Sequence, residues 1–331
     1  MIISRAPVRF SLGGGGTDLP PYYEKHGGFV VSAAIDKYVY VTANKRFYPD
    51  IRLAYSKVEI ARTVDEIEHR IFREALRLTG VTGGIELTSV ADVPANSGLG
   101  SSSTFTVALL NALHTYRRRF ISSAQLAEEA CEIEMNRLKE PVGKQDQYIA
   151  AFGNVSAITI EKDGSVHVEP VPVDDSLLAD LESNLVILYT GIERPARQVL
   201  AEQTANVRAK SEVTLDGMHR IKELGHEVYR LLVAGDADRF GELLDEHWKR
   251  KRTLAASMTD PVLDEHYEAA RKAGALGGKI MGAGGGGFFM FYVRPEDRRR
   301  VLETMIARGL RPLRFRFDTD GARIVANLHR S

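Results

Sequence analysis

Three clusters of glycine constrain this 331-residue chain more than any other feature of its sequence. They lie at residues 13–16, within PANSGLGSSS at residues 94–103, and at residues 282–287. Glycine loses more conformational freedom on folding than any other residue, and a run of glycines adds no side chain to a core. Loops that approach a ligand closely therefore explain three such clusters better than three ordinary turns do.

The second cluster has the composition of a phosphate-binding loop. Its glycines allow backbone N–H groups to approach an anion, and the apolar segment TFTVALLNALHTY that follows predicts a buried helix. The positive end of that helix dipole points back at the loop. The hydroxyls of Ser101, Ser102 and Ser103 add donors and a candidate Mg²⁺ ligand. Helix capping would explain one serine, but it leaves Gly98 and Gly100 unexplained.

Two common nucleotide-binding motifs are excluded. A Walker A loop has Gly-Lys followed by Ser or Thr, whereas Gln145 and Ile280 follow the two Gly-Lys pairs of this type. Residues 282–287 satisfy the G-x-G-x-x-G spacing, but the sequence predicts a helix before them and a strand after them. A dinucleotide site needs the opposite order, so this match is accidental.

Charge and composition exclude several classes of protein. The chain has 44 Lys and Arg against 44 Asp and Glu, and this balance argues against general nucleic-acid binding. Cys131 is the only cysteine, so no intrachain disulfide can form. The N-terminal sequence MIISRAPVRF is too short and polar for a signal peptide, and no apolar run approaches the roughly 20 residues of a membrane span. We expect a cytoplasmic enzyme that binds neither nucleic acid nor membrane.

The hydrophobic pattern indicates both strands and helices and is compatible with an α+β chain of two domains, residues 1–173 and 174–331. The stretch PVPVDD at residues 170–175 is the best candidate for the boundary, although the length alone also allows one large domain. The first domain combines strands with helices, and the second is mostly helical before it returns to strands. Helices are predicted over residues 65–79, 104–116, 123–138 and 295–308. Short hairpins are predicted at Asp163-Gly164 and Asp320-Gly321.

The three clusters, in this order and at these positions, resemble the GHMP kinase superfamily, which includes galactokinase and the homoserine, mevalonate and phosphomevalonate kinases. Its second motif, P-x-x-x-G-L-G-S-S, stands at residues 94–102 without a departure, and the resemblance spans the whole chain. Four stretches are most similar to the members that act on D-glycero-D-manno-heptose 7-phosphate: APVRFSLGGGGTDLPPYY, VGKQDQYIAAFGN, the His247-Trp248 segment and GALGGKIMGAGGGGFF. Galactokinases have G-E-H-T-D-Y where residues 14–19 read GGGTDL, which argues against galactose as the acceptor.

The resemblance implies the two-domain GHMP kinase fold, with an N-terminal domain like domain 2 of ribosomal protein S5 and a ferredoxin-like C-terminal domain. ATP, with Mg²⁺, would phosphorylate the anomeric hydroxyl of the heptose 7-phosphate to give the 1,7-bisphosphate. Kinase activity on fucose, galactose or arabinose is one alternative, and a non-catalytic sensor of sugar or nucleotide is another. A homodimer is compatible with this reading.

The resemblance also assigns the catalytic residues. Asp146 matches the catalytic aspartate of the family, and Arg9 matches the basic residue beside it. A carboxylate near the acceptor hydroxyl can orient it and accept its proton, and a guanidinium can neutralise the transferred phosphoryl group. The alternatives are that Asp146 only caps a helix and that Arg5 takes the place of Arg9.

The expected ATP-binding residues belong to the second motif: Pro94, Ser97, Gly98, Leu99, Gly100, Ser101, Ser102 and Ser103. The resemblance makes Ser102 and Glu134 the expected Mg²⁺ ligands, with Glu132 as a weaker candidate.

The residues expected to bind the sugar phosphate are Gly15, Gly16, Thr17, Asp18, Gly191, Arg194, Gly284 and Gly285. Among them, Thr17 and Asp18 are expected to contact sugar hydroxyls. Arg194 is expected to hold the substrate phosphate, because it follows the predicted buried strand LVILYT. The basic run at residues 249–252 is the alternative, although such a run is usually a solvated helix face. Trp248 is expected to be a core residue.

Overall fold

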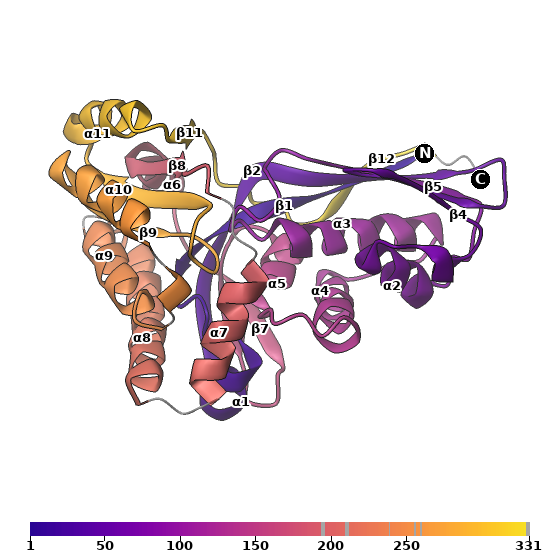
Figure 1. The fold of residues 1–331 in the computed structure, drawn as a ribbon, viewed down its shortest axis with the longest axis horizontal. Helices are drawn as coiled ribbons and strands as arrows, with labels where there is room; N and C mark the ends of the chain where they lie inside the picture. The colour runs from indigo at the N-terminus through magenta and orange to yellow at the C-terminus, as the bar shows by residue number, and fades with distance from the viewer. Residues whose placement is uncertain (193–195, 209–211, 238, 255, 259, 329–331) are drawn as a thin grey trace.

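The computed structural model describes residues 1–192, 196–208, 212–237, 239–254, 256–258 and 260–328. Two lobes are visible, each built around one β-sheet (Figure 1). The larger sheet has eight strands and the smaller has four.

The larger sheet has the strand order β12-β1-β2-β5-β3-β4, and β6 joins the other half of β2 and pairs with β7. Its strands are β1 (Ile2–Gly13), β2 (Gly28–Lys45), β3 (Ile51–Ala54), β4 (Val58–Ala61), β5 (Ile85–Ala91), β6 (Val155–Ile160), β7 (Val166–Pro170) and β12 (Arg323–Asn327). Strand β2 is 18 residues long, and its two halves pair with different partners. Among the described strands, β3 and β5 are the one pair that runs parallel.

Helices α2 (Arg70–Thr79), α3 (Ser101–Tyr116) and α4 (Ser123–Cys131) lie along one face of this sheet (Figure 1). Helix α3 is buried from Ser103 to His114, as its mostly apolar sequence predicts. The helix predicted over residues 123–138 changes after Cys131 into a π-helical turn, Glu132–Arg137. The helix predicted over residues 65–79 is divided in the structure into a 3₁₀ turn, Val64–Glu66, and helix α2.

The smaller sheet is antiparallel, with the order β11-β8-β10-β9. Its strands are β8 (Leu185–Tyr189), β9 (Ala275–Ile280), β10 (Phe288–Val293) and β11 (Arg311–Leu313). The remaining helices are α1 (Pro20–His26), α5 (Gln145–Phe152), α6 (Asp175–Asn184), α7 (Ala196–Arg208), α8 (Glu212–Ala234), α9 (Phe240–Lys251), α10 (Pro261–Lys272) and α11 (Pro295–Ala307), with a 3₁₀ turn at Ala256–Met258. Trp248 is fully buried beside Tyr267, which confirms its core role.

The hairpin predicted at Asp163-Gly164 is confirmed, because β6 and β7 pair on either side of this turn. The hairpin predicted at Asp320-Gly321 is wrong. Strand β12 pairs with β1, and the backbone of Asp318 bonds to Ala34 and Asn154 on the way. The chain end therefore returns to the larger sheet, although it follows the smaller one in sequence. The domain boundary at residues 173 and 174 stays a prediction.

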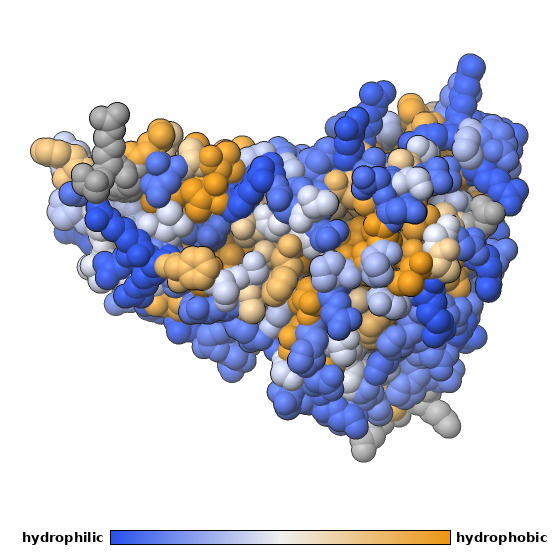
Figure 2. Space-filling model, turned by 180° about the vertical axis from the view of Figure 1, so that it is seen from behind, coloured by the Kyte–Doolittle hydropathy of each residue, from blue (hydrophilic) through white to orange (hydrophobic). Residues whose placement is uncertain are grey.

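The face opposite to that of Figure 1 is hydrophilic over most of its area, with hydrophobic side chains in smaller patches (Figure 2). Exposed apolar residues of the larger sheet include Val58, Ile60, Val90 and Val325. Among the residues described above, no helix combines the length and the apolar character needed to cross a membrane.

Candidate active site

Residues of all three glycine clusters line one cavity of about 160 Å³. They are Gly15 and Gly16 of the first cluster, Asn96, Gly98, Gly100, Ser101, Ser102 and Ser103 of the second, and Gly282 and Ala283 of the third. Segments separated by more than 250 positions in the sequence therefore line the same cavity. This convergence is the structural reason why the chain carries three such clusters.

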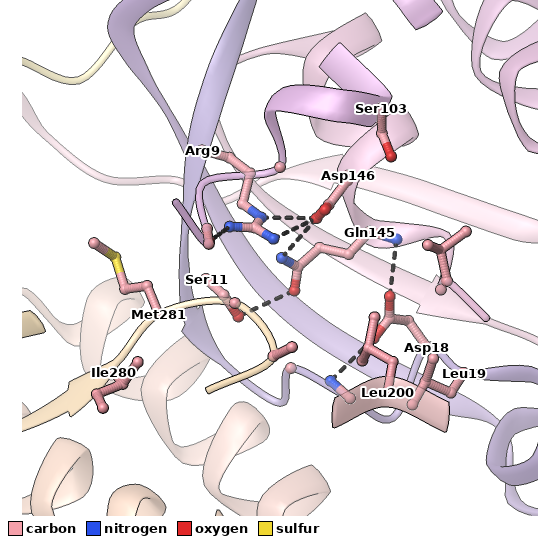
Figure 3. A pocket seen from close by; sticks show the side chains of 18 of the residues that line it. Arg9, Ser11, Asp18, Leu19, Ser103, Gln145, Asp146, Leu200, Ile280 and Met281 are labelled. Carbon is pink, nitrogen blue, oxygen red and sulfur yellow. Dashed lines mark hydrogen bonds and ion pairs between the residues drawn. The ribbon is translucent and has the colours of Figure 1, made fainter. Parts of the chain in front are cut away.

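Arg9 and Asp146 form an ion pair at this cavity (Figure 3). Arg9 comes from β1, and its Nε and Nη2 both lie 2.7 Å from Oδ1 of Asp146, which stands in the first turn of α5. The Nη1 atom of Arg9 donates to the carbonyl oxygen of Gly98 at 2.6 Å. Gln145 Nε2 lies 3.4 Å from the same Asp146 oxygen, and Ser11 donates to Gln145 Oε1 at 3.0 Å. The guanidinium thus joins the phosphate loop to the carboxylate.

Helix capping does not account for Asp146, because the N-cap of α5 is Lys144 and no side chain caps the helix. Arg5 is also separate from the site. It lies over the Tyr38 ring, 4.0 Å from its centroid, and pairs with Asp318. The pairing of β1 with β2 shifts register between Pro7 and Arg9, and an irregularity of this kind changes the direction in which later side chains point.

The phosphate loop ends in an uncapped helix. Gly100 is the N-cap of α3, with φ of 77°, and no side chain bonds to the first helical N–H groups. Those free donors, together with Ser101, Ser102 and Ser103, make the cavity wall suited to an anion. A Cβ on Gly100 would lie 3.0 Å from the Asp146 carboxylate, so the loop and the carboxylate touch.

Gly98 brings the second and third clusters together. Its φ is 82°, and a Cβ there would lie 2.6 Å from the carbonyl oxygen of Met281. Three of the expected ATP-binding residues do not line the cavity: Pro94 is exposed, Leu99 belongs to the core, and Ser97 is buried. Ser97 is buried beside the third cluster, where its carbonyl would meet a Cβ on Gly287.

Asp18 is buried at the opposite wall from Ser103 (Figure 3). It accepts hydrogen bonds from the backbone N–H groups of Gly16 and Gln145, both at 3.0 Å. Burial raises the pKa of the Asp18 carboxyl, and the two N–H donors act against that rise. Thr17 is different, because its hydroxyl donates to the carbonyls of Gly14 and Phe29 and stabilises the turn. Asp18, and not Thr17, therefore presents a polar group to the cavity.

Glu134 is buried behind the phosphate loop, on the π-helical turn. Its carboxylate accepts hydrogen bonds from Ser103 Oγ at 2.7 Å, Thr106 Oγ1 at 2.8 Å and the side-chain amide of Gln147. Burial raises the pKa of Glu134 to about 6, and these three donors limit the rise. The serine that contacts Glu134 is therefore Ser103, which also lines the cavity, rather than the expected Ser102.

Three further residues line the cavity: His247, Lys251 and Lys279. The sequence named the run that contains Lys251 only as the alternative phosphate site, and it gave no site role to the other two. Lys251 belongs to the basic run at residues 249–252, but it is the one member that is buried. A signal was present, because Phe240, Leu244, His247 and Lys251 follow helical spacing on the buried face of α9. Lys279 stands within the small and apolar sequence of β9, an unusual setting for a lysine.

The other expected substrate residues lie elsewhere. Gly191 is exposed and does not line the cavity, and Arg194 lies outside the described residues. Gly284 packs against Met258, and the N–H of Gly285 donates to the Met258 carbonyl at 2.7 Å. The third cluster therefore reaches the cavity through Gly282 and Ala283 instead.

Two family models match the chain: the GHMP kinases N terminal domain over residues 69–154 and the GHMP kinases C terminal domain over residues 228–310. The chain belongs to the GHMP kinases, which use ATP as the phosphate donor, and it is an ATP-dependent sugar kinase. The predicted α+β fold with two domains is confirmed.

The chain is similar to a D-glycero-alpha-D-manno-heptose 7-phosphate kinase from Campylobacter jejuni, with 29% identity over 92% of this chain and 93% of that protein. It is 27% identical to an L-fucokinase/L-fucose-1-P guanylyltransferase from Bacteroides fragilis, of which it spans 37%. Among solved structures, a D-glycero-D-manno-heptose 1-phosphate kinase from Bacteroides thetaiotaomicron aligns with a TM-score of 0.83 and 27% identity, over 99% of this chain and 100% of that one. The mevalonate kinase of Methanococcus jannaschii shares the fold at 17% identity, with a TM-score of 0.74 over 96% of this chain and 98% of that one.

Proposed function

We propose that this kinase phosphorylates the anomeric hydroxyl of D-glycero-D-manno-heptose 7-phosphate to give the 1,7-bisphosphate. The ion pair of Arg9 and Asp146 carries the proposal, because it stands in the cavity where the phosphate loop and Asp18 meet. The heptose kinases among the relatives support this choice of acceptor. ATP and a sugar phosphate are the small-molecule partners in this proposal, and we infer a cytoplasmic site of action. A homodimer stays a prediction.

In this mechanism the acceptor hydroxyl lies between Asp146 and the γ-phosphorus of ATP. Asp146 accepts the hydroxyl proton while the hydroxyl oxygen bonds to phosphorus and ADP leaves. Arg9 orients Asp146 through two N–H groups and offsets the negative charge that gathers at the transferred group. The free N–H groups at the start of α3 bind the phosphates of ATP. Asp18 accepts hydrogen bonds from other sugar hydroxyls and holds the ring in position.

A panel of acceptors tests this proposal, because the names of the relatives point to two positions for the substrate phosphate. The panel compares heptose 7-phosphate, heptose 1-phosphate, free heptose, fucose, galactose and arabinose by ADP release. We expect the highest kcat/KM with heptose 7-phosphate, by about 100-fold or more over the free sugars. ³¹P NMR of the product should show a new phosphate on the anomeric oxygen. A higher kcat/KM with heptose 1-phosphate or fucose would refute the acceptor.

The surroundings of Glu134 fit Mg²⁺. The candidate ligand atoms are all oxygens: the hydroxyls of Ser102 and Ser103, which line the cavity, and the carboxylate of Glu134, which is buried behind Ser103. The described residues contain no group of three or more His, Cys, Asp or Glu that could hold a metal ion, so ATP phosphates and water would complete the coordination. A bound cation would also offset the cost of burying the Glu134 charge. Mg²⁺ would supply charge neutralisation at the phosphates of ATP.

Replacing Glu134 with glutamine should raise the Mg²⁺ concentration for half-maximal activity about 10-fold or more, because the amide keeps the shape but loses the charge. Titration of activity with Mg²⁺ at saturating ATP measures this effect. Glu132→Gln is the matched control, since Glu132 is half-buried on the same turn and contacts Asn136 and Arg137 instead of the serines at the cavity. Equal Mg²⁺ curves for the two variants would remove Glu134 from the metal site.

A further inference from the structure

We propose that Lys251, Lys279 and His247 form the receptor for the phosphate group already present on the acceptor. The inference rests on the proposed function and deepens it, because it assigns the residues that make this kinase specific for a sugar phosphate over a free sugar. All three side chains line the same cavity as Arg9 and Asp146.

The two lysines are buried cations without a carboxylate partner. Lys251 is 7% exposed and Lys279 is 2% exposed. Over the described part of the chain, neither ammonium forms an ion pair with Asp or Glu. Lys251 donates to the carbonyl oxygen of Gly282, and Lys279 donates to the carbonyl oxygen of Leu12 at 3.1 Å. An ammonium has three N–H donors, so each lysine keeps donors beyond these backbone contacts.

Burying like charges together is costly unless an anion joins them. Burial and the charge of Arg9 lower the pKa of Lys251 to about 8, while Asp18 acts in the opposite direction. Burial and the charges of Lys251 and Arg9 lower the pKa of Lys279 well below its usual value. A phosphate dianion between the two lysines would stabilise their charged forms.

His247 adds a neutral donor to the cationic pair. Its ring is 2% exposed, and burial beside the lysines lowers its pKa well below the usual range. Lys279 Nζ lies 3.3 Å from Nδ1. A charged ammonium only donates, so beside the charged form of Lys279 the Nδ1 atom is the acceptor. The proton of the neutral ring then resides on Nε2, a buried atom with no hydrogen-bond partner among the described residues. An unpaired buried donor is rare in a folded protein, and a phosphate oxygen would satisfy it.

Two features of the lysines favour the acceptor phosphate over the phosphates of ATP. The carbonyl that accepts from Lys279 belongs to Leu12, directly before the first glycine cluster, and Asp18 is the carboxylate whose charge acts on Lys251. Both belong to the part of the site that we assign to the sugar. In the proposed mechanism the ATP phosphates already have the free N–H groups and serines at the start of α3, in the lobe of the larger sheet, whereas Lys279 belongs to the smaller sheet. The cavity therefore has two anion sites, one from each lobe.

The test compares heptose 7-phosphate with free D-glycero-D-manno-heptose as acceptors of Lys251→Met and Lys279→Met. We expect the ratio of their kcat/KM values to fall about 10- to 100-fold in each variant, because a charge-assisted hydrogen bond to phosphate is lost. The KM for ATP should stay within about 2-fold of wild type. Lys249→Met is the matched control, since Lys249 is exposed and pairs with Asp245; its ratio should be unchanged. An equal loss for both acceptors, or a rise confined to the KM for ATP, would overturn the assignment.

A second measurement uses the wild-type enzyme and does not depend on the folding of a variant. Inorganic phosphate should inhibit competitively against heptose 7-phosphate and so raise its apparent KM. The KM for free heptose should stay unchanged. Competition with ATP alone would place the phosphate at the α3 loop and refute the receptor. If the wild-type enzyme turns over no heptose phosphate, the proposed function fails. Direct titration of inorganic phosphate into wild type and into Lys279→Met then tests the phosphate receptor separately. Equal affinities of the two proteins for phosphate would refute the receptor.

Discussion

Replacing Asp146 with asparagine should lower kcat by about 10²- to 10⁴-fold while the Kd for ATP changes little, because the variant loses the group that accepts the acceptor proton. Asparagine has the same shape and can still accept a hydrogen bond from Arg9 through its side-chain oxygen. The first turn of α5 should also be kept, since Asp146 caps nothing. In the proposed mechanism the ATP phosphates bind at the start of α3, which this substitution leaves intact.

Steady-state kinetics with saturating acceptor, together with ATP titration of the free enzyme, measures both parts of this expectation. Asp163→Asn is the control, because Asp163 lies on the exposed turn between β6 and β7. Its kcat should equal that of wild type. A kcat for Asp146→Asn within about 3-fold of wild type would show that positioning alone, without proton transfer to this residue, carries the reaction.

The local features of the fold could be predicted from the sequence because nearby residues determine them. The start of α3 follows from the glycines and serines before an apolar run, and the π-helical turn lies inside a helix that the periodicity already indicated. The return of β12 to β1 could not be predicted in this way. It depends on which edge of the larger sheet is left unpaired by the other strands, and no short-range pattern records that.

The site shows the same difference between residues that a local motif predicts and residues that only the folded structure brings together. Arg9, Asp18 and Asp146 stand in motifs, and the structure brings all three to the cavity. Lys279 was missed because its role comes from burial beside α9 and not from its neighbours in sequence. The exchange of Ser102 for Ser103 beside Glu134 reflects the rotation of about 100° between successive residues of a helix, which a motif cannot resolve.

Replacing Arg9 with methionine should lower kcat/KM by about 10²- to 10³-fold and should also weaken ATP binding, because this guanidinium holds two parts of the site at once. It orients Asp146 through Nε and Nη2, and it holds the carbonyl of Gly98 in the phosphate loop through Nη1. Methionine fills similar volume but leaves the Asp146 carboxylate without its cation. The effect on ATP binding distinguishes this variant from Asp146→Asn.

Arg9→Lys sharpens the test, because one ammonium at the end of a flexible chain cannot reproduce a planar donor set shared between Asp146 and Gly98. We expect it to recover only part of the lost kcat/KM. Arg5→Met is the matched control on the same strand, since Arg5 contacts Tyr38 and Asp318 away from the cavity. Kinetics and ATP titration of the three variants measure these effects. If Arg9→Met behaves like Arg5→Met, the Arg9 guanidinium has no part in phosphoryl transfer. Asp146 would then be oriented by Gln145 and the start of α5 alone.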